Sequence, residues 1–507
     1  MTTAGERLEQ VLADRPRRAT LGLAASDLVS TASTLLAAGY RLALITAVET
    51  SGPLRIEYLF TDGPPDQRIE LEVEVDRGSP RIPSLAHVSF PAGRFEREMR
   101  DLFGIEPVGH PQPRPLVLHQ HWTPGWHPMR SDAGPQPPML SDAAPYPFIR
   151  VEGSGVYEIP VGPVHAGLIE PGHFRFSVVG ETIVKMKARL WFVHKGIERL
   201  FEGRDAASAV TLAEKISGDT AVGHGLAYVQ AVEEARGIEV TPRGNELRAV
   251  LLELERLYNH VADVGALCND VGFGLVNAHA LTLRELLLRM NEAVTGHRLL
   301  RGGVALGGAS LLSLPRLDQL REVGDQFRRL VDLARSNSIV MDRFTGTAVL
   351  SMEQSREIGV LGVVARASGL CIDARSAHPF VDAPVAFRPA CRDTGDVLAR
   401  FLVRCDEVAS SLDLLSHYIA RTGPLADISA DRGSRSAGRG SGIVEGWRGT
   451  VVHRVEVDAG GTLERVKVVD PSFLTWPALP IALADTIVPD FPLVNKSFNL
   501  SYAGNDL

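Results

Sequence analysis

Residues 214–233 read EKISGDTAVGHGLAYVQAVE, and this stretch has the pattern of a loop that leads into a buried helix. Asp219 or Thr220 is placed to cap the first turn by accepting hydrogen bonds from free backbone N–H groups. His224 and Tyr228 are four residues apart and therefore lie on one face of the predicted helix. An imidazole beside a phenol suits a redox or proton-transfer pocket. The alternative is an ordinary pair of buried core side chains.

The composition is that of a soluble globular protein with a sizeable core. The chain has 507 residues, 45% of them hydrophobic, and a net charge of −8 without a long basic run, which argues against a nucleic-acid partner. Its N-terminus lacks an apolar segment of signal-peptide type, and no run of about 18 uncharged apolar residues is long enough to span a membrane. Docking on a membrane remains open. The cysteines form no C-x-x-C pair and are expected to be free thiols: Cys268, Cys371, Cys391 and Cys405.

The first 130 residues are predicted to form a small α/β unit. A helix is expected at residues 26–38, where helix-forming apolar residues recur. Strand-like segments then follow at residues 40–48, 55–60 and 68–75. The last of these alternates cleanly between apolar and polar residues, so one of its faces is expected to be buried.

A charged segment and a proline-rich segment close this first unit. The charged segment is expected to be helical from about Arg94 to Gly104, with its charges on a solvated face. Prolines crowd residues 107–147, which excludes helices and central strands there. Residues 131–147 are therefore interpreted as a semi-rigid linker.

Residues 148–507 are predicted to form a second, larger and mostly helical domain with flanking antiparallel strands, so the fold class is α+β. Strands are expected at 156–160, 173–178 and 181–190, and a hairpin at 450–457 and 463–469. Helices are expected from Asn245, as a cap, to Cys268, and at 278–300 and 317–336. Residues 430–442, rich in Gly, Ser and Arg, are expected to be a flexible loop.

The first unit resembles the C subunit of respiratory NADH:quinone oxidoreductase (complex I). The resemblance rests on F-E-R-E-M-R-D-L-F-G-I, followed by G-H-P and then by H-P-M-R, in that order. The same domain occurs in group 4 membrane-bound hydrogenases and in formate hydrogenlyase. The resemblance implies a docking domain without a cofactor of its own.

The second domain resembles the D subunit of complex I and the large subunit of group 4 [NiFe] hydrogenases, which share one fold. The motifs G-P-V-H-A-G-L-I-E-P-G-H-F-R-F, H-K-G-I-E-R-L, V-A-R-A-S-G and D-P-S-F-L fall in the order of that family. Together the two resemblances cover nearly the whole chain. A fusion of this kind is typical of large subunits of the hydrogenase-4 and formate hydrogenlyase type.

The residues that hold nickel and iron in these hydrogenases are replaced here. The family places four cysteines in C-G-I-C and in D-P-C-x-x-C, whereas this chain has hydroxyl residues at all four positions: Ser217, Thr220, Ser472 and Thr475. Nickel needs soft thiolate ligands, and a hydroxyl is hard and stays protonated at neutral pH. The sequence therefore predicts that this chain binds no metal.

The resemblance to complex I implies a quinone pocket instead. His165 falls on the loop histidine and Tyr228 on the helix tyrosine that bind the quinone head group, and both can donate protons to a carbonyl oxygen. His224 matches the hydrogenase histidine that follows C-G-I-C. Glu198, Arg366 and Asp373 are expected to line this pocket or to couple its charge to the membrane arm. The last two are also expected in a buried ion-pair network, the alternative being an ordinary loop salt bridge.

The resemblance further implies a peripheral subunit on the cytoplasmic face of the plasma membrane. Its expected partners are a small iron–sulfur subunit, similar to the B subunit of complex I, that carries a [4Fe-4S] cluster, a ferredoxin-like subunit and antiporter-like membrane subunits. Quinone would be the substrate, electron transfer would be coupled to ion translocation, and NAD would bind only through other subunits. Two alternatives stay open: an active [NiFe] hydrogenase large subunit and a non-catalytic assembly scaffold.

The metal prediction can be tested directly. We expect the complex purified from its native host to contain iron but no stoichiometric nickel, and to lack hydrogen uptake, because hydroxyl side chains cannot replace bridging thiolates. Elemental analysis and a hydrogen-uptake assay measure the two quantities. Stoichiometric nickel together with activity would overturn the prediction.

Overall fold

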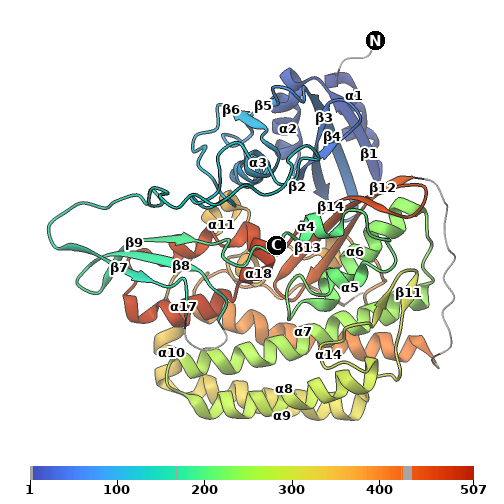
Figure 1. The fold of residues 1–507 in the computed structure, drawn as a ribbon. Helices are drawn as coiled ribbons and strands as arrows, with labels where there is room; N and C mark the ends of the chain where they lie inside the picture. The colour runs from blue at the N-terminus through green and yellow to red at the C-terminus, as the bar shows by residue number, and fades with distance from the viewer. Residues whose placement is uncertain (1–3, 166–168, 385, 424, 426–436) are drawn as a thin grey trace. The chain divides into compact units, whose positions relative to one another are not determined.

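The computed structural model describes residues 4–165, 169–384, 386–423, 425 and 437–507 (Figure 1). The chain divides into two compact units, Met1–Ile149 and Arg150–Leu507. Both units combine helices with strands, in agreement with the predicted α+β class. Among the described residues, no helix is long and apolar enough to cross a membrane.

The first unit is built on a four-stranded sheet in the order β1-β4-β3-β2. Strand β1 pairs parallel with β4, and the other neighbours are antiparallel. The predicted alternation in β4 is confirmed, because Ile69, Leu71, Val73 and Val75 are buried. The elements of this unit are α1 (Ala4–Asp14), β1 (Arg18–Leu23), η1 (Ala25–Asp27), α2 (Leu28–Ala37), β2 (Arg41–Glu49), β3 (Leu54–Asp62), β4 (Gln67–Val75), β5 (Arg81–Pro83), α3 (Phe90–Phe103) and β6 (Glu106–Val108).

Helix α3 is the predicted charged helix, but its charges are not on a solvated face. Gly104 ends it in a left-handed conformation with φ of 74°, as expected for a glycine stop. Glu96 is fully buried and accepts hydrogen bonds from the Ser84 hydroxyl and the Leu85 N–H. Asp101 accepts from three successive backbone N–H groups of residues 116–118. The prediction of a solvated face was wrong, since Glu96 binds the segment before the helix and Asp101 binds the proline-rich segment after it.

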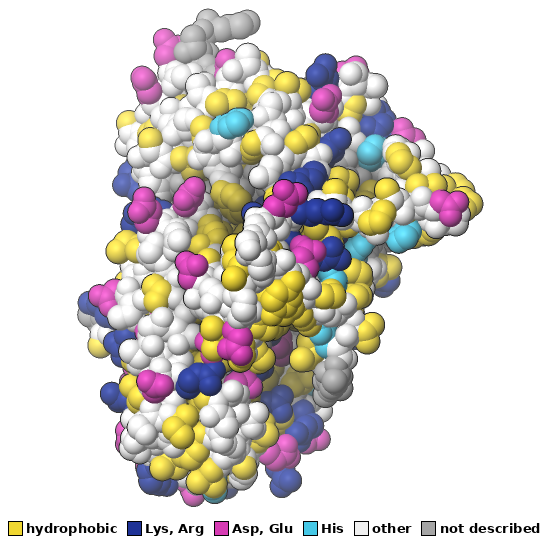
Figure 2. Space-filling view, turned by 90° about the vertical axis from the view of Figure 1, so that its left-hand side faces the viewer, with side chains coloured by type: hydrophobic (Ala, Val, Ile, Leu, Met, Phe, Trp, Pro, Cys, Tyr) yellow, Lys and Arg dark blue, Asp and Glu magenta, His cyan; other side chains and the backbone are white. Residues whose placement is uncertain are grey.

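The second unit begins with the predicted antiparallel sheet of β7 (Val156–Val161), β8 (His173–Val179) and β9 (Thr182–Arg189). Its centre is aromatic, because Phe174 and Phe176 are buried. Its outer residues Tyr157, Val179 and Val184 are exposed. Figure 2 looks onto the side of the molecule on which Figure 1 draws this sheet, and hydrophobic side chains gather among the charged ones there.

Long helices form the body of this unit, with α7 (Pro242–Asp270) and α14 (Val397–Thr422) packed along each other. The predicted cap at Asn245 was wrong. The N-cap of α7 is Thr241, whose hydroxyl accepts from the Gly244 N–H, with Pro242 in the first turn. Helix α14 was not predicted. The other elements of this body are α4 (Ile197–Phe201), α5 (Val210–Ala213), α6 (Ala221–Arg236), α8 (Gly274–Thr295), β10 (Val304–Ala305), β11 (Gly308–Ala309), α9 (Leu317–Ser336), α10 (Ser338–Phe344), α11 (Met352–Ile358), α12 (Gly362–Ala367) and α13 (Ala374–Ala377).

A three-stranded antiparallel sheet lies against α6. Its strands are β12 (Gly438–Gly446), β13 (Gly449–Val457) and β14 (Leu463–Val469), so the hairpin is confirmed. The predicted flexible loop was wrong from Gly438 onward, where the chain is strand β12; residues 430–436 lie outside the described part. The chain then continues through α15 (Pro471–Thr475), α16 (Ala478–Ala482), η2 (Val488–Asp490), α17 (Phe491–Phe498) and α18 (Tyr502–Asp506).

Alternate glycines explain why β12 can lie so close to α6. A Cβ atom on Gly438, Gly440 or Gly442 would fall 1.9, 2.2 or 1.9 Å from a backbone oxygen of the helix. These oxygens belong to three alanines spaced four residues apart on one helix face, Ala227, Ala231 and Ala235. The backbone of the strand therefore packs directly against the backbone of the helix, and this contact determines the position of α6 on the sheet.

The cysteine prediction was wrong for two of the four residues. Cys371 and Cys391 form a disulfide that closes the loop containing α13. Cys268 and Cys405 are free, as expected. The sequence could not indicate this pair, because the two cysteines are 20 residues apart. They come within bonding distance only when α12 packs against α14.

The glycine packing leads to a stability prediction. We expect Gly442→Ala to lower the free energy of unfolding by about 1–3 kcal/mol or more, because its Cβ would overlap the Ala227 oxygen. Denaturant unfolding of the purified chain measures this loss.

Gly22→Ala is the matched control, because Gly22 also lies in a strand but has no atom within 4 Å of its missing Cβ. It should be neutral or stabilising by up to about 1 kcal/mol. Equal losses in the two variants would mean that close packing at β12 is not the cause.

Candidate functional site

Helix α6 is held at its N-terminus by a residue from another helix. The Glu255 carboxylate of α7 accepts hydrogen bonds from the N–H groups of Val222 and Gly223, at 2.7 and 2.9 Å. The predicted side-chain cap was therefore wrong: Thr220 occupies the N-cap position but makes no capping bond. The carboxylate of Asp219 is engaged elsewhere.

The four hydroxyl positions come together in one buried cluster although they lie far apart in sequence. Ser217, Thr220, Ser472 and Thr475 are each at most 2% exposed. The Ser217 hydroxyl lies 2.9 Å from that of Ser501, whose N–H donates to the Ser472 hydroxyl at 3.0 Å. Thr475 donates to the Pro471 carbonyl and accepts from the Leu361 N–H. Together with the bond from Thr220 to Asp219, these contacts give each of the four hydroxyls a protein partner.

An ion pair adjoins this cluster. The Arg448 guanidinium donates two hydrogen bonds to the Asp219 carboxylate, at 2.6 and 2.7 Å. The same carboxylate accepts from the hydroxyls of Ser217 and Thr220, each at 3.1 Å. Burial raises the pKa of Asp219, but Arg448 outweighs this and holds it below its usual range. A fixed guanidinium beside hard, protonated oxygen ligands does not fit a nickel–iron centre, so no step of the chemistry is assigned to one.

His224 lies in a chain of buried side chains at the other side of this cluster. Its Nε2 is 3.0 Å from the Asp470 carboxylate, and its Nδ1 is 3.0 Å from Nε2 of His453 on β13. Burial raises the pKa of Asp470, but the bond to His224 holds it below its usual range. Burial and the neighbouring His224 lower the pKa of His453 well below 6.5, which keeps that ring neutral.

Tyr228 lies one turn further along α6 and is fully buried. Its hydroxyl donates to the Ala206 carbonyl at 2.7 Å. Its ring stacks on Phe201 with centroids 5.3 Å apart, and its other ring neighbour is His453 at 6.3 Å. Burial and the nearby Asp205 raise the pKa of the phenol, so it is a proton donor rather than a phenolate.

His165 reaches the cluster by a separate, aromatic route. Its Nε2 lies 2.8 Å from the Gly172 carbonyl, and its ring is 6.1 Å from Phe174 of β8. Phe174 in turn contacts Trp476, whose indole N–H donates to the Ser501 carbonyl. In the described part of the chain, no hydrogen bond or ring contact joins His165 directly to Tyr228.

Glu198 lies in a buried ion cluster on the outer side of β14. Its carboxylate pairs with Arg465 at 2.7 Å and Lys467 at 3.0 Å, and all three side chains are at most 6% exposed. Burial raises the pKa of Glu198, but the two cations outweigh it and bring the pKa to about 2. Glu198 is therefore bound in an ion cluster of its own, with no described bond to the hydroxyl cluster.

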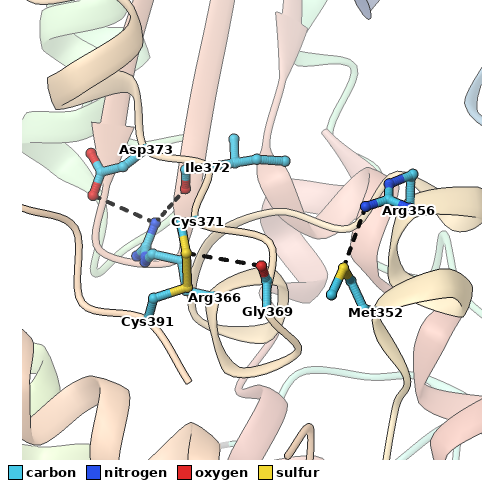
Figure 3. Close-up of a disulfide and its surroundings, with 8 residues drawn as sticks. All are labelled: Met352, Arg356, Arg366, Gly369, Cys371, Ile372, Asp373 and Cys391. Atoms are coloured by element: carbon cyan, nitrogen blue, oxygen red, sulfur yellow. Dashed lines mark hydrogen bonds and ion pairs between the residues drawn. A yellow bond between two sulfur atoms is a disulfide. The ribbon is translucent and has the colours of Figure 1, made fainter. Parts of the chain in front are cut away.

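The ion-pair network expected around Arg366 and Asp373 is present and fully buried. The Arg366 guanidinium pairs with Glu445 at 2.6 Å and with Asp373 at 3.6 Å, and it also pairs with Glu407 of α14. Figure 3 shows that it also reaches the carbonyl of Ile372, directly beside the disulfide. Asp373 pairs further with Arg375 at 2.7 Å. These ion pairs link α12, α13, α14 and β12 to one another.

Three residues of the site were not singled out from the sequence. Arg448 lies in the short turn between β12 and β13, His453 lies in β13, and Asp470 precedes α15. Asp470 stands inside the D-P-S-F-L motif, which was a usable signal. No signal in the sequence pointed to Arg448, because its partner Asp219 is 229 residues away.

Three protein families match parts of the chain. Residues 21–138 match the respiratory-chain NADH dehydrogenase 30 Kd subunit, and residues 270–434 match the 49 Kd subunit. Residues 195–267, which include α6 and most of α7, match nickel-dependent hydrogenase. The match thus changes from one family to the other within one domain.

Curated relatives extend over most of the chain. Formate hydrogenlyase subunit 5 of Escherichia coli (strain K12) is 33% identical over 86% of this chain and 79% of its own length. The C/D subunit of the NADH-quinone oxidoreductase of Phocaeicola vulgatus is 29% identical over 68% of this chain and 70% of its own length. A chain of the membrane-bound sulfane sulfur reductase, an archaeal respiratory membrane complex, is similar in structure with a TM-score of 0.65. It is 25% identical, and the match covers 71% of this chain and all of that one.

The Glu198 ion cluster leads to a prediction with a defined pH dependence. Glu198→Gln removes the carboxylate that neutralises Arg465 and Lys467, so we expect a loss of roughly 3–5 kcal/mol in the free energy of unfolding at neutral pH. Because the folded pKa of about 2 lies below the usual 4.5, this contribution is complete above pH 4.5 and is lost as the pH falls toward 2.

Denaturant unfolding at several pH values measures the difference between wild type and variant. That difference should shrink steadily below pH 4.5. Glu285→Gln, which removes an exposed ion pair with Arg298, should change stability little. A Glu198→Gln difference that did not depend on pH would contradict the prediction.

Proposed function

The chain belongs to the family of fused 30-kDa and 49-kDa complex I-like subunits that includes formate hydrogenlyase subunit 5 and hydrogenase-4 component G, and from this we propose its function. These relatives are subunits of membrane-bound hydrogenase and oxidoreductase complexes. We infer that this chain is an oxidoreductase subunit that passes electrons from a partner iron–sulfur subunit to a quinone-like acceptor. The first unit would be its docking domain, and the second would hold the acceptor.

One observation carries this proposal: the hydrogenase site keeps its fold but has lost its soft ligands. Ser217, Thr220, Ser472 and Thr475 each have a hydrogen-bond partner within the protein, and Arg448 with Asp219 brings fixed charges to the same place. A chain of this family without a metal of its own needs an organic acceptor for its electrons. The similarity to the C/D subunits of NADH-quinone oxidoreductases points to a quinone.

His165 and Tyr228 are the proposed proton donors. Reduction of a quinone to a quinol takes two electrons and two protons, and the electrons would come from the [4Fe-4S] cluster of the partner subunit. The Tyr228 phenol, kept protonated by its surroundings, would give one proton to one quinone oxygen, and the His165 imidazole would give one to the other. A quinone oxygen at Tyr228 would replace the Ala206 carbonyl as acceptor of the phenol hydrogen bond.

The buried network around Arg366 is proposed to couple this chemistry to ion translocation. Its charges extend from α12, next to the site, to Glu253 and Glu407 on the long helices α7 and α14. A change of charge at one end would shift the others, because the whole network is shielded from water. Antiporter-like membrane subunits on the cytoplasmic side would receive this signal. A ferredoxin-like subunit and, for NAD, further subunits would supply electrons.

Two other functions compete with this proposal. An active hydrogenase is favoured by the 33% identity to formate hydrogenlyase subunit 5 but opposed by the missing thiolates. A non-catalytic assembly scaffold is favoured by the full burial of Tyr228, whose hydroxyl already has a partner. Only the quinone proposal requires the side chains of both His165 and Tyr228.

Quinone-dependent turnover of the intact complex tests the proposal. Tyr228→Phe and His165→Ala should each lower it, by a factor on the order of 10² or more, because each variant removes one proton donor. Tyr58→Phe is the matched control: Tyr58 is also fully buried but lies in β3 of the first unit, so turnover should stay at the wild-type level.

Assembly is followed in the same preparations by their subunit composition. Fully assembled variants with wild-type turnover would exclude the pocket and favour the scaffold. Asp373→Asn adds a test of coupling: it should lower ion translocation more than quinone reduction, and coupled turnover at the wild-type level would contradict a role of the network.

A further inference from the structure

Three titratable side chains form a continuous row that includes a residue of α6. They are Asp470, His224 of α6 and His453. They come from three different segments, namely the residue between β14 and α15, the first turn of α6 and the middle of β13. Both gaps between them are 3.0 Å, the length of a good hydrogen bond. All three side chains are at most 1% exposed. The row is therefore sealed from water along its length.

When Asp470 is ionised and both rings are neutral, the hydrogen-bond pattern fixes where the protons sit. A carboxylate only accepts, so Nε2 of His224 carries a proton and donates to it. In a neutral ring the other nitrogen, Nδ1, must then accept, and it accepts from Nε2–H of His453. By the same rule, Nδ1 of His453 is left as a bare acceptor.

That last nitrogen has no partner in the described part of the chain. His453 is 0% exposed, and its Nδ1 is a fully buried polar atom without a hydrogen bond. Such an atom costs roughly 1–3 kcal/mol, and protein interiors rarely leave one unsatisfied. An apolar side chain would fill the same space without this cost. The geometry thus places a proton acceptor on His453, whose ring lies edge-on to that of Tyr228 with centroids 6.3 Å apart.

The same packing that positions α6 also creates the row. His453 lies directly opposite Gly442 in the β12–β13 ladder, so both residues face the helix. Because Gly442 has no side chain, the helix backbone at Ala227 comes into contact with the strand. His224 is thereby brought within hydrogen-bond distance of His453. At the other end, a Cβ on Gly504 would lie 2.4 Å from the Asp470 carboxylate, so that carboxylate is also closely enclosed.

We propose that Asp470, His224 and His453 form a buried proton relay. A proton that binds Nδ1 of His453 releases the proton on Nε2 of the same ring to Nδ1 of His224. The proton on Nε2 of His224 then moves to Asp470. One proton has entered, one carboxylate has become a carboxylic acid, both rings have changed tautomer, and no electron has moved. The reverse sequence returns that proton from Asp470 to Nδ1 of His453.

The purpose of the relay rests on the proposed function, in which protons would be exchanged with the quinone pocket at the His453 end of the row. Tyr228 is fully buried, so a phenol that gives up its proton cannot regain one directly from water. A row of neutral rings can carry a proton without holding a charged ring in the interior, where an isolated charge is costly. Arg448, whose charge helps to lower the pKa of Asp470, is already paired with Asp219. His453 and His224 therefore act as positioning and transfer groups.

Infrared difference spectroscopy of the intact complex, between its oxidised and reduced forms and without added quinone, tests the relay. We expect reduction to produce the C=O band of a protonated carboxyl. Asp470→Asn should abolish this band, because the amide accepts the bond from His224 but cannot take up a proton. His453→Gln should abolish it as well, because its amide keeps the donor toward His224 but cannot exchange a proton.

His260→Gln is the matched control, because His260 is also fully buried and bonded to a carboxylate, that of Glu407, at 2.8 Å. The band should persist in this variant. A band that persists in His453→Gln, or that disappears equally in His260→Gln, would overturn the relay.

Turnover gives a second and separate result. In assembled complexes, His453→Gln should lower quinone turnover by a factor on the order of 10². If the band behaves as expected while His165→Ala and Tyr228→Phe keep full turnover, the relay stands and the quinone pocket fails. If the band is absent from the wild type while those two variants are inactive, the relay fails and the pocket stands.

Discussion

The contact between the glycine-bearing strand β12 and the alanine face of α6 is the constraint on which the rest of the site depends. Side chains are absent from the strand at Gly438, Gly440 and Gly442, so the helix lies directly on the sheet. That closeness brings His224 to His453. The Glu255 carboxylate fixes the N-terminal end of the helix through two backbone N–H groups. A displacement of α6 by the length of one bond would separate the hydrogen bonds that its residues make in the site.

The chemical character of the site follows from the hydroxyl groups that stand at the thiolate positions of the hydrogenases. Four hydroxyls, one carboxylate and one guanidinium are satisfied by hydrogen bonds within the protein, so the space is held by hydrogen bonds and charge rather than by metal–sulfur bonds. Two routes lead from it, one through the aromatic rings to His165 and one through the buried histidines toward Tyr228.

The sequence predicted most elements whose periodicity is strong. The strands β2 to β4 and β7 to β9 and the helices α8 and α9 lie within a few residues of the predicted ranges, because alternation and helical spacing are local signals. Helix α6 lies where a buried helix was expected to follow a loop. Predictions failed where contacts with another segment of the chain determine the burial or the secondary structure of a residue. The Asp101 carboxylate of α3 is buried because the backbone N–H groups of residues 116–118 bind it. The glycines of β12 indicated a loop because their partner, the face of α6, lies some 200 residues away.

The sequence by itself determined which groups are available: hydroxyls in place of thiolates, a loop histidine, a helix tyrosine and the order of the family motifs. These are properties of single positions, and no folding is needed to see them. Only the tertiary structure decided which groups meet. It paired Asp219 with Arg448, joined Cys371 to Cys391 and lined up Asp470, His224 and His453. Such contacts depend on the packing of backbones to within a few tenths of an ångström, and residue type and spacing along the chain do not specify that distance.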